Sequence, residues 1–184
     1  MTQRVLVSIA GIVGIALLAN ASVRAAQIIP TGVEYTNDTI EQAGQLQACI
    51  VTTAIVSPPA PEIVNFQLLI VFGRPGFKVT AGDVDWPKQS NVAKRISDAN
   101  FSTAQFNHPN AFTKNVTTEG QLVGMLTDDS LREDFINAFF SGGYSIRFKR
   151  IDISEDRTYY VKQAPDVDVV NTFAKCVHMM AATP

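Results

Sequence analysis

The spacing of apolar and polar residues along the chain predicts strands in its first half and near its end. Five segments have the β-branched content or the period-two alternation of β-strands. These segments are residues 46–56, 63–72, 77–80, 144–153 and 158–163. The run 63–72 is apolar enough to be a central strand. Gly73 to Gly76 predicts a turn before the strand at 77–80, and weaker strand candidates lie near 91–97, 101–106 and 111–118.

Two segments have the apolar period of helices. Ser130 and Glu133 are spaced as a capping box, and an apolar face follows as far as Phe139, before Gly142 and Gly143 end the helix. Residues 122–126 predict a preceding turn or short helix. The last helix is expected after Pro165, with Asp166 as its cap. Its buried face is predicted to consist of Val169, Phe173, Cys176, Val177 and Met180.

The predicted strands come mostly before the predicted helices along the chain, and this order is typical of an α+β fold. We expect an antiparallel sheet of about five to six strands, with two to three helices packed on one face and a single disulfide. Residues 46–184 are predicted to form one α+β domain, because the 184-residue chain has the length of one domain. Residues 27–45 are polar, contain Pro30, Gly32 and Gly44, and are expected to be an irregular N-terminal arm.

The first 26 residues predict a secretory signal peptide. Arg4 precedes an apolar run from Val5 to Ala19, and small residues follow as far as Ala26. Cleavage is expected between Ala21 and Ala26. The alternative is an uncleaved membrane anchor, but the run is short for a span. We therefore expect a bacterial periplasmic or secreted protein with no stable membrane insertion after cleavage.

The chain has two cysteines, Cys49 in the first predicted strand and Cys176 in the last predicted helix. In an oxidising compartment, such an isolated pair most simply forms one structural disulfide. The alternative is a reactive thiol at Cys176.

Composition narrows the functional classes. Hydrophobic residues make up 46% and charged residues 17%, which excludes a disordered chain. The formal charge is −2, so no nucleic-acid partner is expected. The chain has no nucleophile elbow, phosphate loop or dinucleotide fingerprint, so no cofactor is expected either.

Asp83 and Asp85 are the carboxylate pair that best fits a catalytic role. Alternate residues of a strand share a face, so the two side chains could converge in a small exported hydrolase. We expect no metal there, because the spacing of a calcium-binding loop is missing.

Trp86, Phe106, His108 and Phe112 lie in the least regular part of the chain and predict a recognition surface. Two alternatives remain open for them. The aromatic side chains could belong to the core, and His108 could be a solvated turn residue.

Asn37, Asn100 and Asn115 each begin a glycosylation acceptor tripeptide. These sites matter only if the source of the protein glycosylates exported proteins.

The order of elements resembles that of small exported bacterial proteins of the invasion-associated locus B type. The matching stretches are Ala48 to Ile50, Phe139 to Gly143 and Tyr159 to Val177. They span most of the chain after the predicted signal peptide. The chain lacks the additional mid-chain cysteines of that group, and the resemblance implies no catalytic residues.

These observations favour an exported, non-catalytic domain that binds a protein or an envelope component. Two alternatives stay open. One is a small exported enzyme that uses Asp83 and Asp85, or Cys176. The other is an inhibitor of another exported protein.

Overall fold

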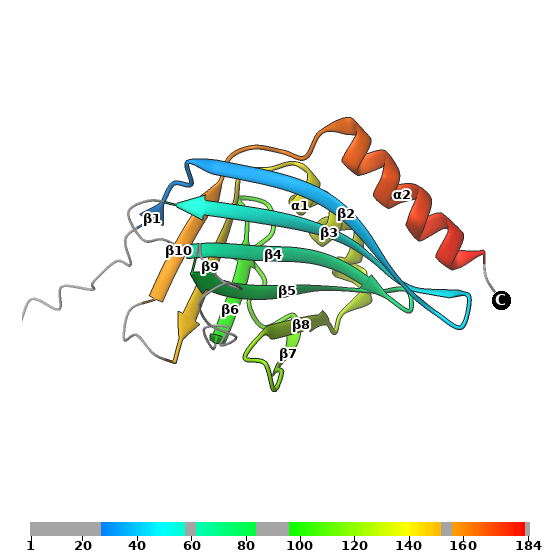
Figure 1. Cartoon of the computed structure of the whole chain (residues 1–184), viewed down its shortest axis with the longest axis horizontal. Helices are drawn as coiled ribbons and strands as arrows, with labels where there is room; N and C mark the ends of the chain where they lie inside the picture. The colour runs from blue at the N-terminus through cyan, green and yellow to red at the C-terminus, as the bar shows by residue number, and fades with distance from the viewer. Residues whose placement is uncertain (1–26, 58–61, 84–95, 152–155, 183–184) are drawn as a thin grey trace, which may run out of the picture.

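The computed structural model describes residues 27–57, 62–83, 96–151 and 156–182, and their strands form two sheets (Figure 1). The larger sheet has six antiparallel strands in the order β2-β3-β4-β5-β8-β7. These strands are β2 (Gly32–Gln42), β3 (Gln45–Ser57), β4 (Glu62–Val71), β5 (Arg74–Asp83), β8 (Leu122–Leu126) and β7 (Phe112–Val116). The strands from β2 to β5 form a meander, so the β2–β3 and β4–β5 turns lie at the same end of the sheet.

The smaller sheet has four strands in the order β1-β10-β9-β6. Its strands are β1 (Gln27–Ile28), β10 (Asp156–Val161), β9 (Tyr144–Arg150) and β6 (Ile96–Ser102). The short β1 pairs in parallel with β10, and the other pairs are antiparallel.

Aromatic side chains fill the core between the two sheets. The ring of Phe66 in β4 lies 5.5 Å from the ring of Phe101 in β6 and 5.9 Å from that of Tyr144 in β9. All three residues are buried. We call the face of the large sheet that carries Phe66 its inner face. Because each aromatic side chain buries about 150–250 Å², these contacts contribute a large share of the core.

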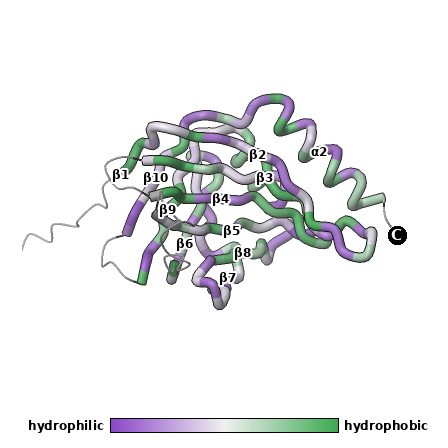
Figure 2. The backbone as a smooth tube through the Cα atoms, in the orientation of Figure 1, coloured by the Kyte–Doolittle hydropathy of each residue, from purple (hydrophilic) through white to green (hydrophobic). Residues whose placement is uncertain are grey.

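Two helices complete the fold. The helix α1 (Arg132–Phe140) follows a 3₁₀ turn, η1 (Asp129–Leu131). The helix α2 (Val167–Ala181) packs on β3 and β2, and Figure 2 shows hydrophobic and hydrophilic stretches alternating along it. Its N-terminus is capped as predicted, since the Asp166 carboxylate accepts a hydrogen bond from the Val169 amide at 2.9 Å. Cys176 joins it covalently to Cys49 in β3.

The coarse prediction of a mostly antiparallel α+β fold with one disulfide between Cys49 and Cys176 is confirmed. The predicted packing differs, because the strands divide into two sheets and the smaller sheet, together with the helices, covers the inner face. Alternation along a strand determines which of its faces is buried, but it does not determine which strands pair.

Two segments differ from the predicted elements. Residues 27–45, expected as an irregular arm, contain β1 and the eleven-residue β2. β2 is an edge strand in which the half-buried Asn37 is polar and the exposed Ile40 is apolar, so its alternation is weak. Residues 122–126, expected as a turn or short helix, form β8. Five residues are too few for the apolar period to distinguish a strand from a helical turn.

Within the described ranges, no helix is long and apolar enough to cross a membrane. Residues 1–26 lie outside these ranges, so the signal peptide and its cleavage remain predictions.

Candidate binding site

Two of the four residues of the predicted aromatic surface, Phe106 and Phe112, are buried. Phe106 and Phe112 have exposed fractions of 1% and 8%, and their rings lie 5.5 Å and 5.1 Å from the ring of Phe135 in α1. His108 is exposed and its ring lies 5.0 Å from that of Phe106. The two phenylalanines therefore belong to the core, and Trp86 lies outside the described residues.

Of the three residues in the two enzyme hypotheses, the structure describes Asp83 and Cys176 but not Asp85. Asp83 is the last residue of β5, and Asp85 lies outside the described residues, so the hydrolase hypothesis stays a prediction. Cys176 is bonded to Cys49 and has no free thiol in this state. Among the described residues, no group of three His, Cys, Asp or Glu side chains is arranged to hold a metal ion.

The three glycosylation tripeptides begin in different environments. The amide of Asn37 donates a hydrogen bond to the carbonyl of Val169 at 3.1 Å, and that of Asn100 accepts one from Lys114 at 2.6 Å. Asn115 is exposed on the edge strand β7. Of the three, Asn115 is therefore the most accessible to modification.

A buried group of hydroxyls joins the two sheets. The Tyr144 hydroxyl lies 2.9 Å from that of Thr53 and 3.3 Å from that of Tyr35, which donates to the Gln163 carbonyl at 2.6 Å. Burial raises the pKa of Tyr144 well above its ordinary value, and burial also raises the pKa of Tyr35. Both side chains are therefore held neutral, which suits a structural hydrogen-bond network and disfavours a catalytic phenolate.

The turn between β4 and β5 places Phe72 in the left-handed backbone conformation. Phe72 and Gly73 have φ angles of 48° and 77°, as Ala43 and Gly44 have 52° and 76° in the turn between β2 and β3. Positive φ at both residues defines the tight hairpin turn that Asn-Gly sequences favour. A large aromatic residue is rare there, yet Phe72 occupies the position with 72% of its surface exposed.

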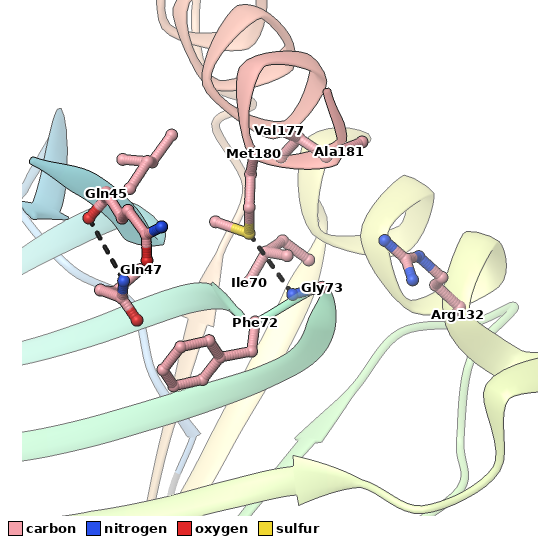
Figure 3. Close-up of a pocket in the computed structure, with 10 residues that line it drawn as sticks. Gln45, Gln47, Ile70, Phe72, Gly73, Arg132, Val177, Met180 and Ala181 are labelled. Carbon is pink, nitrogen blue, oxygen red and sulfur yellow. Dashed lines mark hydrogen bonds between the residues drawn. The ribbon is translucent and has the colours of Figure 1, made fainter. Parts of the chain in front are cut away.

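Phe72 lies beside an apolar cluster on the outer face of the large sheet, opposite the core. The strand register places Ile40 opposite Ala48, and Ala48 opposite Val71. Figure 3 shows the Phe72 ring pointing away from Met180 of α2, although both residues line the same cleft. We define the outer patch as Ile40, Ala48, Ile50, Leu69, Val71, Phe72 and Val123.

The members of the outer patch differ in exposure. Ala48, Ile50 and Leu69 are buried and pack against the half-buried Val71 and Val123. Ile40 and Phe72 are exposed at 52% and 72%. Two large apolar side chains therefore project beside a cluster that the sheet itself builds.

A cleft of about 440 Å³ lies on the other side of the same turn (Figure 3). Its walls come from the end of α2, the tips of the β2–β3 and β4–β5 hairpins, and Arg132 at the start of α1. A second, wider depression of about 1160 Å³ shares Phe72, Gly73 and Arg132 with it. Phe72 thus borders both concave surfaces as well as the outer patch.

This site was not predicted from the sequence, because Gly73 to Gly76 predicts a turn at residues 73–76, whereas the turn lies at Phe72 and Gly73. The strands on either side of Phe72-Gly73 are ten residues long each and are joined by a two-residue hairpin turn. The signal that could have located the turn is an X-Gly dipeptide between two strand-forming segments. In such turns X is usually Asn, whereas here it is Phe.

Comparison of the chain with protein-family models, with curated proteins and with solved structures finds no match. The resemblance to the invasion-associated locus B type therefore stays a hypothesis.

Proposed function

We propose that the protein is an exported, non-catalytic binding domain that contacts a protein partner through the outer patch. One observation carries the proposal: Phe72 combines an unfavourable backbone conformation with 72% exposure. Strain of this kind costs stability and is concentrated at functional sites. Exposed aromatic side chains are also the residues that most often dominate the energy of protein interfaces.

The surroundings of Phe72 support this proposal. The outer patch lies on hydrogen-bonded strands, so a partner would meet a surface that is already ordered.

The disulfide supports export, because isolated structural bridges persist in oxidising compartments. The formal charge of −2 gives no support to a nucleic-acid partner. If the partner is itself an exported enzyme, the domain is an inhibitor that uses the same surface.

Site-specific photo-crosslinking tests the proposal. A photo-reactive amino acid replaces Ile40, which leaves Phe72 in place, and the protein is irradiated in cells that export it. A matched control carries the same group at Lys149, which is exposed on β9 of the other sheet. We expect one discrete protein adduct from position 40 and none from position 149. Equal adducts from both positions, or none from position 40, would contradict the proposal.

A further inference from the structure

The cleft beside the outer patch has a composition that suits one class of small molecule. Its lining combines the apolar side chains of Leu46, Ile70, Val177 and Met180 with the polar side chains of Gln45 and Gln47. Among the described residues that line it, Arg132 is the only charged one. Its volume of about 440 Å³ lies within the range of small-molecule sites.

Two hydrogen-bond donors face the cleft. Figure 3 shows the Arg132 guanidinium directed from α1 toward the cleft, with the Gly73 amide on the facing hairpin. The Gly73 N–H donates only to the Met180 sulfur, at 3.4 Å. A thioether is a weak acceptor, and the flexible methionine side chain can move aside for a stronger one.

Arg132 is also weakly engaged by the protein. Its only described ion pair is with Asp129, at 4.0 Å, and the Asp129 side chain is 86% exposed. Asp129 lines the wider depression and not the cleft. A carboxylate in the cleft would therefore meet a guanidinium whose ion pair with Asp129 is long and solvent-exposed, and hence weak.

We propose that this cleft binds a carboxylate that carries an unbranched apolar chain, such as a medium-chain fatty acid. The Arg132 guanidinium and the Gly73 N–H would hold the carboxylate, and the apolar chain would lie along Val177, Met180 and Ile70. A peptide with a free C-terminal carboxylate is the competing occupant, because Gln45 and Gln47 could meet its amides, and the titration below distinguishes the two. Phe72 borders both this cleft and the outer patch, but the carboxylate is assigned to Arg132 and Gly73, so neither proposal depends on the other.

Calorimetric titration of the purified, disulfide-bonded protein with decanoate at pH 7.5 tests this inference. Decanol has the same chain without the charge, and acetate has the charge without the chain. We expect decanoate to bind at least about tenfold more tightly than decanol, and acetate not to bind measurably. Equal affinity for decanoate and decanol would overturn the carboxylate assignment. Tighter binding of a short apolar peptide through its C-terminus would overturn the fatty-acid assignment.

Two arginine variants locate the site. Arg132→Gln is expected to weaken decanoate binding about tenfold while leaving decanol binding unchanged. Arg74→Gln is the matched control. Arg74 is on the same hairpin as Gly73, but it lines only the wider depression and not the cleft. A loss in Arg74→Gln equal to that in Arg132→Gln would show that decanoate binds elsewhere. Thermal unfolding of each variant establishes that it is folded, and the wild-type comparison of decanoate with decanol does not depend on either variant.

Discussion

At the scale of single residues, the two tight hairpins of the large sheet allow a direct comparison. Their first turn residues, Ala43 and Phe72, have nearly the same positive φ. Each pays the steric cost of the left-handed conformation, which is about 1–2 kcal/mol for residues with a Cβ atom. Ala43 is small, whereas Phe72 also exposes a large apolar ring. The requirements of folding explain neither Ala43 nor Phe72 at these positions. The proposed binding role would explain only Phe72.

Replacing Phe72 with Asn is therefore expected to stabilise the fold. Asn tolerates the left-handed conformation, and little buried surface is lost with a ring that is 72% exposed. We predict a gain of about 1 kcal/mol in the free energy of unfolding, measured by urea denaturation. Ala43→Asn should give a similar gain. A clear loss of stability in Phe72→Asn would mean that the ring serves packing.

Tyr144 is predicted to make stability depend on alkaline pH. Its pKa is raised in the folded state, so the folded protein keeps the proton at pH values where the unfolded chain releases it. The corresponding stability is fully present below the ordinary value of 10.0 and declines as the pH rises above it.

Tyr144→Phe should remove most of that decline and cost about 1–2 kcal/mol near neutral pH, because the Thr53 hydroxyl loses its partner. Urea denaturation between pH 7 and 11 measures both effects. Tyr160→Phe is the control, since Tyr160 lies on the neighbouring strand β10 and is only half-buried. If the free energy of unfolding of Tyr144→Phe declines with alkaline pH as steeply as that of the wild type, Tyr144 is not the group responsible.

At the scale of elements, α2 was the segment best predicted from sequence. Its cap at Asp166 and its buried residues Val169, Phe173 and Cys176 agree with the expected pattern. Local rules suffice there, because capping and a period of 3.6 act within one helix. They fail for β2 and β8, whose strand conformation depends on pairing with β3 and β5. Long-range pairing leaves little trace in a short or polar segment.

The disulfide is expected to hold α2 on the sheet. Cys49 and Cys176 are separated by 127 positions, and closing so long a loop stabilises a fold by about 4–5 kcal/mol in the chain-entropy model. We predict a loss of that order in the Cys49→Ala, Cys176→Ala double variant, measured by urea denaturation. The reduced wild-type protein should behave like the double variant. A loss below about 1 kcal/mol would show that packing alone docks α2.

At the scale of the whole molecule, the α+β class of the fold and the disulfide between Cys49 and Cys176 could be predicted from the sequence. The division of the strands into two sheets could not. The late hairpin at Tyr144 to Val161 was predicted as a pair of strands, yet nothing in its alternation indicates that it forms a second sheet with β6. Phe106 and Phe112 were assigned to a surface because their segment is irregular, whereas α1 supplies Phe135 to bury them. The outer patch and the cleft escaped prediction for the same reason: both are built where hairpin ends meet other elements.

The most direct test of the account combines the crosslinking probe with the two hairpin variants. The photo-reactive group stays at position 40, and Phe72→Asn or Ala43→Asn is introduced beside it. If Phe72 is the anchor for a partner, Phe72→Asn should abolish the adduct although the protein is more stable, and Ala43→Asn should retain it. An adduct that survives Phe72→Asn at the wild-type yield would contradict the central claim that this turn is a binding site.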